Sequence, residues 1–254
     1  MGSSEVTIKR DIPFAEREQR KLLCDIYQPP AARAKGVGIV HIHGGGGTGG
    51  SRDGARLAAS LAESGYVSVA MQYRLAQEAL WPAQLDDVNA CIDWVKRNAF
   101  DLGITSSRIA LLGYSIGAQF GIIAAGGAEA GIAACVCLYP SGRDDNGSAN
   151  VLGTERAERE LDSLDPLAYV HSEFPPTQLF HGNADMVVDV QSSFELYRAL
   201  SGVGVAVELH IMEGVNHGFE GYPEFAVPSV ALIDLFLERH VVNPRSYRDR
   251  PSRR

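Results

Sequence analysis

Short apolar runs recur along the chain and alternate with segments of helical periodicity. The runs that predict strands lie at residues 5–9, 22–27, 36–42, 66–71, 108–113, 133–139, 177–181 and 205–212. Helices are predicted at about residues 53–64, 83–99, 116–126, 190–201 and 227–240. Alternation of this kind is typical of a mostly parallel sheet with helices on both faces. The pattern therefore predicts an α/β fold built on an eight-stranded sheet.

The two strands nearest the N-terminus differ from the others in their connection. Polar residues rather than a helix separate residues 5–9 from residues 22–27, so we expect these strands to pair antiparallel. The remaining six strands fit right-handed βαβ crossovers. Asp53 and Pro82 are the expected start signals of the first two helices.

Residues 141–176 interrupt this rhythm with a polar stretch and a short charged helical segment at residues 154–164. Because a connection this long inside a compact domain is usually functional, we expect a small lid there. Otherwise residues 1–254 are predicted to form one domain, with a basic flexible tail at residues 243–254. The five arginines of the tail would suit an anionic partner, but a solvated terminus explains them more simply.

Length and charge narrow the class of protein. A chain of 254 residues that is 45% hydrophobic fits a single globular domain, and a net charge of −8 argues against a nucleic-acid partner. No run approaches the roughly 18 apolar residues that a membrane helix needs. The first residues, "MGSSEVTIKRD", lack the apolar region of a secretory signal. We therefore expect a cytoplasmic protein with no membrane partner.

The cysteines point to no metal site or disulfide framework. They form no CxxC pair, and the histidines do not stand at metal-ligand spacing from them. We expect Cys24, Cys91, Cys135 and Cys137 to be reduced core residues and the protein to bind no metal.

The segment "GYSIG" at residues 113–117 matches the pattern G-x-S-x-G and runs from a predicted strand into a predicted helix. Such a turn holds its serine in a strained backbone conformation, and its glycines leave room where a Cβ would collide with neighbouring elements. Ser115 is therefore the candidate nucleophile, and a helix N-cap serine is the alternative interpretation.

A serine nucleophile needs a base, and that base needs a carboxylate to fix its tautomer. Asp185 and His217 lie in loops after predicted strands, which open on the same sheet edge as Ser115. Asp189 is the alternative acid, but it opens the next predicted helix, where a charge or cap at the helix start is its expected role. We expect structural roles for His171, His181, His210 and His240.

The stretch "HIHGGGG" at residues 41–47 follows the first predicted parallel strand. Attack on an acyl carbon places negative charge on its oxygen, and backbone N–H groups stabilise that charge best where no side chain intervenes. A phosphate-binding loop is the competing interpretation of a glycine run, but no GK[ST] follows.

Five ordered motifs carry a resemblance to a known family: "HIHGGGG…SRD", "YRLAQEALWPAQLDDVNACIDWV", "GYSIGAQ", "HGNADMVVDV" and "GVNHGF". Across about residues 20–240 the chain resembles the carboxylesterase branch of the α/β-hydrolase superfamily, in particular its hormone-sensitive-lipase-like and feruloyl-esterase-like bacterial enzymes. The resemblance implies an α/β-hydrolase fold with a minimal lid. It places the nucleophile, acid and base at Ser115, Asp185 and His217.

The chain departs from that family at two motif positions. Ile116 stands where the family usually has alanine, so its bulk would narrow the acyl pocket or move a neighbour. Gln77 replaces the proline that is usual in "YRLAPE". About 40 residues precede the glycine loop, too few for the large N-terminal cap of the lipase-like members, so we expect an open site unsuited to long-chain lipids.

The sequence thus predicts a serine hydrolase that cleaves small-molecule carboxylic esters, with short to medium acyl chains or small aromatic groups, through an acyl-enzyme and without a cofactor. The expected oxyanion donors are the amides of Gly45, Gly46 and Ile116. The expected pocket residues are Gly44, Gly47, Trp81, Tyr114, Tyr139 and Phe219. An amidase, arylformamidase or peptidase on the same triad, and a non-catalytic small-molecule receptor, are the alternatives. By analogy with related folds we expect a homodimer.

Overall fold

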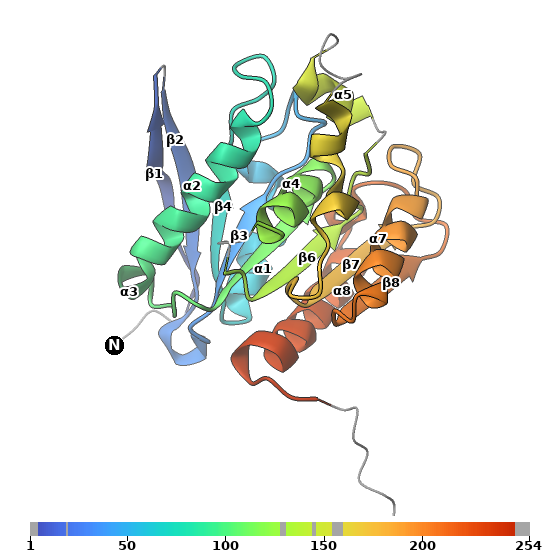
Figure 1. The fold of residues 1–254 in the computed structure, drawn as a ribbon. Helices are drawn as coiled ribbons and strands as arrows, with labels where there is room; N and C mark the ends of the chain where they lie inside the picture. The colour runs from blue at the N-terminus through green and yellow to red at the C-terminus, as the bar shows by residue number, and fades with distance from the viewer. Residues whose placement is uncertain (1–4, 19, 128–130, 144–145, 154–159, 247–254) are drawn as a thin grey trace, which may run out of the picture.

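The computed structural model describes residues 5–18, 20–127, 131–143, 146–153 and 160–246. Within them one twisted eight-stranded sheet has the strand order β1-β2-β4-β3-β5-β6-β7-β8 (Figure 1). Its strands are β1 (Thr7–Arg17), β2 (Arg20–Gln28), β3 (Gly38–Ile42), β4 (Val67–Met71), β5 (Ile109–Tyr114), β6 (Ala134–Leu138), β7 (Thr177–Gly182) and β8 (Val207–Met212). β1 and β2 pair antiparallel, β2 and β4 pair antiparallel, and β3 to β8 are parallel. The predicted strand pattern and its antiparallel start are confirmed, except that β1 extends to Arg17, through residues expected to connect the first two strands.

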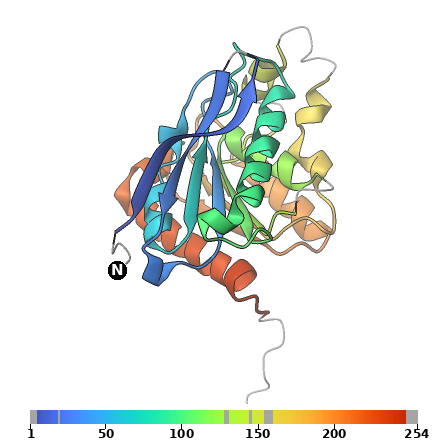
Figure 2. The same ribbon diagram turned by 90° about the vertical axis from the view of Figure 1, so that its left-hand side faces the viewer.

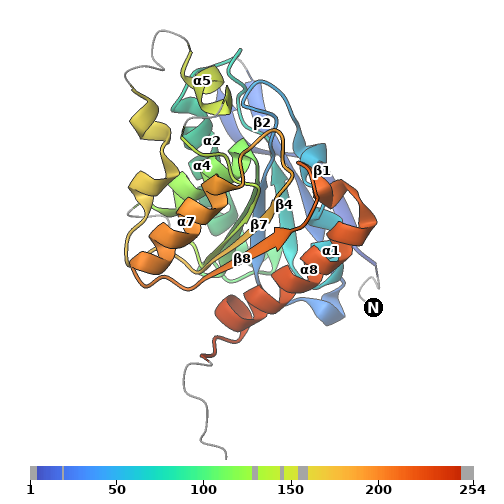
Figure 3. The same ribbon diagram turned by 90° about the vertical axis from the view of Figure 1, so that its right-hand side faces the viewer.

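Helices cover both faces of the sheet (Figures 1 to 3). They are α1 (Ala58–Glu63), α2 (Ala83–Arg97), α3 (Ala99–Leu102), α4 (Ile116–Ala125), α5 (Asn146–Leu152), α7 (Gln191–Gly202) and α8 (Pro223–Leu237). Apolar side chains of α2, α4 and α7 pack in one core, and those of α1 and α8 pack in the core on the opposite face. Cys135 and Cys137 belong to the first core and Val136 to the second, because alternate residues of a strand face opposite sides.

Two predicted helix starts are wrong. The helix expected from residue 53 begins at Ala58, because the Ser51 side chain accepts the Asp53 N–H and closes a separate 3-10 turn at Arg52–Gly54. The helix expected at residues 227–240 begins at Pro223, a residue suited to a first helical turn, and ends at Leu237 before a π turn. By contrast, Pro82 directly precedes α2, as predicted.

The segment at residues 141–176 contains α5 and two 3-10 turns, Leu161–Leu164 and Pro166–Tyr169. Residues 154–159 of the predicted charged helix and residues 247–254 of the predicted tail lie outside the described residues. Gln119 connects three parts of this segment to α4, because its amide nitrogen lies within 3.1 Å of the Gly142 carbonyl, the Ser148 hydroxyl and the Leu164 carbonyl. Among the described residues, no helix has both the length and the apolar character to span a membrane.

Candidate active site

Ser115 lies in the turn between β5 and α4 with φ 55° and ψ −126°, a strained conformation for a residue other than glycine. The neighbouring glycines permit this turn. A Cβ on Gly113 would lie 2.3 Å from the Ala118 Cα, and one on Gly117 would lie 2.3 Å from the carbonyl oxygens of Ile42 and His43. The close contact of α4 with the sheet therefore requires glycine on both sides of the serine, for the reason that the motif predicted.

Asp185 and His217 meet although they are far apart in the sequence. His217 Nδ1 lies 2.7 Å from Asp185 Oδ2, and the amides of Val187 and Val188 donate to Asp185 Oδ1 at 2.8 and 3.0 Å. Asp189 instead accepts the N–H of Gln191, the first residue of α7, at 2.9 Å, so it lies at the helix start as expected, one residue before the N-cap Val190.

A second histidine holds the same carboxylate. His181 is fully buried, its Nε2 lies 3.1 Å from the Val188 carbonyl and 3.3 Å from Asp185 Oδ2, and its Nδ1 lies 2.7 Å from the Ser193 hydroxyl. Burial raises the pKa of Asp185, but hydrogen bonds from His181, His217 and two amides outweigh it and hold that pKa well below the usual range. Asp185 is therefore ionised, which is the state that a histidine base requires of its partner.

Ser115 and His217 line one cavity of about 200 Å³ at the carboxyl edge of the sheet. Of the other residues predicted for the site, the cavity is lined by Gly44, Gly45, Tyr114 and Tyr139. Its lining also includes residues that sequence reasoning missed, namely His43, Gly50, Gly54, Arg56, Gly218 and Glu220. They lie in loops and short turns. The sequence could have indicated three of them: His43 adjoins the glycine loop, and Gly218 and Glu220 lie within three residues of His217. It carries no such signal for the other three.

Six predicted site residues do not line this cavity: Gly46, Gly47, Trp81, Ile116, Phe219 and Asp185, which reaches it only through His217. The Trp81 ring stacks on Phe120 at a centroid distance of 5.6 Å, and its Nε1 donates to the Ser163 hydroxyl. The Phe219 ring lies behind Tyr139 in the core, with 5.5 Å between ring centroids. Both aromatic rings therefore lie in the core, and only Phe219 packs against a residue that lines the cavity.

The glycine loop has the backbone that glycine permits, with φ values of 110°, 61° and 75° at Gly45, Gly46 and Gly47. Its carbonyls are held by groups outside it: Tyr73 donates to the His43 carbonyl, Asn150 to that of Gly46, and Ala76 to that of Gly47. Gln77, at the position where the resembling family has proline, donates to the Thr48 carbonyl. Within the described residues, no acceptor is bound to the amides of Gly45, Gly46 and Ile116.

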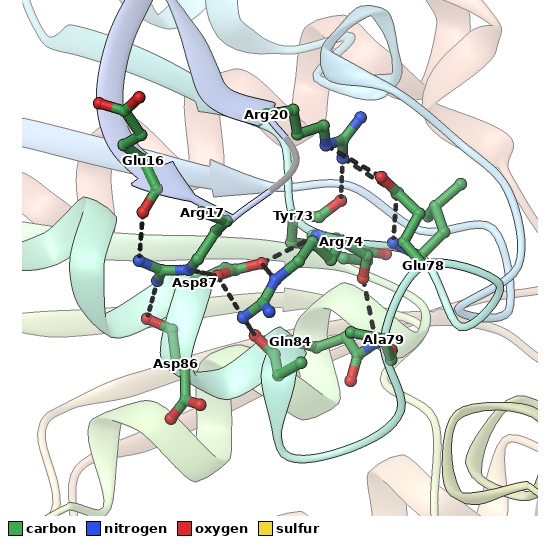
Figure 4. Close-up of polar contacts among 12 residues, drawn as sticks. Glu16, Arg17, Arg20, Tyr73, Arg74, Glu78, Ala79, Gln84, Asp86 and Asp87 are labelled. Atoms are coloured by element: carbon green, nitrogen blue, oxygen red, sulfur yellow. Dashed lines mark hydrogen bonds and ion pairs between the residues drawn. The ribbon is translucent and has the colours of Figure 1, made fainter.

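A buried ionic network fixes the segment that supports this loop (Figure 4). Asp87 of α2 is fully buried and accepts from Arg74 Nε at 2.8 Å, from Arg74 Nη2 at 2.9 Å and from Arg17 Nε at 2.8 Å. Arg74 follows Tyr73, whose ring stacks on His43 with 4.1 Å between centroids. Asp87 thus connects β1 and α2 to the residue that holds the glycine loop.

Burial also keeps two histidines near the loop neutral. It lowers the pKa of His41 to about 3 and that of His43 to about 4, although the Gly44 carbonyl, which accepts from His43 Nδ1 at 2.7 Å, raises the latter. The cavity beside Ser115 therefore receives no positive charge from these imidazoles at neutral pH.

The sequence matches the model of the BD-FAE family over residues 24–137 and 137–200. The chain belongs to this family of feruloyl-esterase-like proteins. This BD-FAE family member is 30% identical over 239 residues to ethyl acetate hydrolase of Pseudomonas putida, covering 82% of the chain and 74% of that protein. It is 27% identical over 240 residues to esterase LipQ of Mycobacterium tuberculosis, covering 83% of the chain but only 57% of LipQ.

The fold of this BD-FAE member also matches that of a solved esterase. Esterase 2 of Thermogutta terrifontis, in a form phosphonylated by sarin, superposes with a TM-score of 0.81 and 22% sequence identity. The match covers 96% of this chain and 97% of that one. The predicted α/β-hydrolase fold and the predicted esterase family are confirmed.

Proposed function

We propose that this protein is a carboxylesterase that cleaves small esters through an acyl-enzyme on Ser115. The observation that carries the proposal is the Asp185–His217 pair at 2.7 Å, whose histidine lines the same cavity as a serine in a strained strand-to-helix turn. A helix N-cap alone would not require that strain or place a histidine and carboxylate beside the serine.

In this proposal the Ser115 hydroxyl oxygen attacks the ester carbonyl carbon while His217 Nε2 takes the hydroxyl proton. Asp185 holds Nδ1–H and stabilises the imidazolium, and the oxyanion binds the amides of Gly45, Gly46 and Ile116. The imidazolium then protonates the departing alkoxide, which leaves as the alcohol. Water attacks the acyl-enzyme with His217 as base, and the carboxylic acid leaves from a regenerated Ser115.

The size of the site supports small substrates. The cavity of about 200 Å³ fits short to medium acyl groups or a small aromatic group better than a long chain. Ethyl acetate hydrolase, whose name specifies a small ester, is a relative at 30% identity. The esterase of similar fold is phosphonylated by sarin, and we expect this chain to react with phosphonates too.

The finer expectations from the sequence belong to the same proposal. They are a small lid at residues 141–176, a homodimer, a cytoplasmic location and the absence of a nucleic-acid partner. The last is supported by the net charge of −8.

The test is hydrolysis of p-nitrophenyl esters from acetate to decanoate by the wild type and by Ser115→Ala, with a fluorophosphonate label located by mass spectrometry. We expect turnover of the short chains, label at Ser115, and a loss of about a thousandfold or more in the variant. Folded wild-type protein that neither turns over the esters nor takes the label would refute the proposal. An anilide hydrolysed faster than the matching phenyl ester would favour an amidase instead.

A further inference from the structure

Tyr139 packs against His217, the proposed base. It directly follows β6 with φ 41°, and its N–H donates to the Phe180 carbonyl at 2.6 Å. Its side chain is almost fully buried, and its ring lies 4.1 Å from the imidazole of His217, centroid to centroid, at a tilt of 50°. The His217 ring is therefore held between a carboxylate at its Nδ1 and an aromatic ring against its side.

The position of Tyr139 is fixed in turn by a buried carboxylate. The Tyr139 hydroxyl donates to Glu220 Oε2 at 2.6 Å, and Glu220 Oε1 lies 3.3 Å from Arg56 Nη1. Glu220 is 5% exposed and stands three residues after His217, in the turn Phe219–Gly221. Burial, and then the neighbouring Glu220, raise the pKa of Tyr139 well above its ordinary value, so its hydroxyl stays a donor.

Burying a carboxylate is unfavourable unless its oxygens are paired, so this arrangement needs an explanation. A similar pair occurs elsewhere: the Tyr66 hydroxyl donates to Asp234 Oδ1 at 2.7 Å beside Lys35. Tyr66 directly precedes β4, at the amino edge of the parallel strands, and does not line the candidate active-site cavity. The pair at Tyr139 differs because its ring contacts His217.

We infer that Tyr139 is a positioning residue for His217 and that Glu220 acts on His217 through it. The ring keeps the imidazole oriented with Nδ1 on Asp185, and its face attracts the imidazolium that forms as Ser115 gives up its proton. Donation of the phenol proton to a carboxylate raises the electron density of the ring and strengthens this attraction. The inference rests on the proposed function, in which His217 is the base.

The test compares Tyr139→Phe and Glu220→Gln with Tyr66→Phe, the control that loses a partly buried tyrosine–carboxylate hydrogen bond away from the cavity. With p-nitrophenyl acetate we expect Tyr139→Phe to lower kcat about tenfold and to leave KM within about twofold, because it changes the base rather than substrate binding. We expect both tyrosine variants to lower the melting temperature by a few degrees, but Tyr66→Phe to leave kcat unchanged. Because Tyr139→Phe removes the hydrogen bond that Glu220→Gln weakens by taking away the carboxylate charge, their effects on kcat should not add in the double variant.

A second readout does not depend on turnover. The downfield proton resonance of His217 Nδ1–H, identified by its loss in His217→Gln, should shift or broaden in Tyr139→Phe and stay in place in Tyr66→Phe. An unchanged resonance and an unchanged kcat in Tyr139→Phe, or equal losses of kcat in both tyrosine variants, would overturn the inference. If the wild type has no esterase activity and takes no label at Ser115, the proposed function fails. The comparison of the His217 Nδ1–H resonance between the two tyrosine variants then tests by itself whether Tyr139 positions His217.

Discussion

Ile116 combines two roles that a substitution can separate. Its amide is a proposed oxyanion donor, while its buried side chain lies behind the glycine loop, where a Cβ on Gly47 would be 3.4 Å from Ile116 Cδ1 and 2.1 Å from Val151 Cγ1. Ile116→Ala keeps the amide and opens this space. We expect the ratio of kcat/KM for p-nitrophenyl octanoate to that for acetate to rise about tenfold, since a few buried methylenes at about 0.8 kcal/mol each suffice.

Ile122→Ala is the control for that substitution. Ile122 is a buried residue of the same helix, and unlike Ile116 it has no atom among those nearest to a Cβ on Gly47. Both variants should lose about 2–4 kcal/mol of the free energy of unfolding, measured by urea denaturation, but only Ile116→Ala should change the chain-length preference. An unchanged preference in Ile116→Ala would mean that its side chain does not limit the acyl pocket.

The positions of residues in short motifs were predictable, and the positions of residues placed by packing were not. Ser115 stands in a pattern whose glycines have a local steric reason, and Asp185 and His217 each follow a strand. His181 is the last residue but one of β7, and nothing local distinguishes a histidine that contacts Asp185 from one buried in the core. The aromatic ring of Trp81 was expected in the pocket but lies in the core. The direction of a side chain in a loop depends on tertiary contacts, which the local sequence does not specify.

At the scale of elements, Asp87 connects a hairpin, a loop and a helix, and its removal tests how strongly they depend on it (Figure 4). Asp87→Asn leaves the guanidinium groups of Arg17 and Arg74 without their buried counter-ion. We expect a loss of about 3 kcal/mol in the free energy of unfolding, measured by urea denaturation, because breaking a buried pair strands its charges.

The exposed pair Arg20–Glu78, drawn in the same view, supplies the comparison. Its nitrogen–oxygen distance of 2.9 Å is as short, but its side chains are 37% and 33% exposed. Glu78→Gln should therefore cost less than about 1 kcal/mol. Equal losses in the two variants would show that burial does not set the strength of these pairs.

Helices were predicted correctly where the periodic pattern was long, and their starts were wrong where a local hydrogen bond determines the first residue. The α2 helix begins directly after Pro82 as expected, because a long amphipathic stripe and a start signal agree. The helix expected from residue 53 failed because one side chain, Ser51, captures the Asp53 N–H and closes a turn first. Competition of this kind depends on single hydrogen bonds, which periodicity does not register.

At the scale of the whole molecule, parallel strands bring the site together. The glycine loop, Ser115, Tyr139, Asp185 and His217 follow β3, β5, β6, β7 and β8, so all lie at the carboxyl edge of one sheet. This convergence follows from strand order and direction, which the alternation of elements predicts. The side chains that hold one another at that edge, such as Glu220 and Tyr139, follow from packing instead.

The burial of His41 and His43 makes the stability of the whole molecule depend on pH. The pKa values of His41 and His43 fall from 6.5 to about 3 and about 4 on folding, so below about pH 6.5 the unfolded chain binds protons that the folded chain does not. The free energy of unfolding should therefore fall as the pH is lowered from about 6.5 towards 4. The depressed pKa of Asp185 adds a loss at lower pH, because its contribution is complete above the unfolded value of 3.8 and disappears as pH falls through the folded pKa.

Urea denaturation at stepwise pH tests this dependence. We expect the wild type to lose about 1 kcal/mol per pH unit for each of His41 and His43 in the upper part of that window. In His41→Gln the free energy of unfolding should be lower throughout, because contacts to Ser68 and Tyr114 are lost, but its slope with pH should be shallower. His171→Gln, which changes an exposed histidine, should keep the wild-type slope. A slope in His41→Gln equal to that of the wild type would mean that His41 takes up its proton without unfolding, and that its burial does not resist acid.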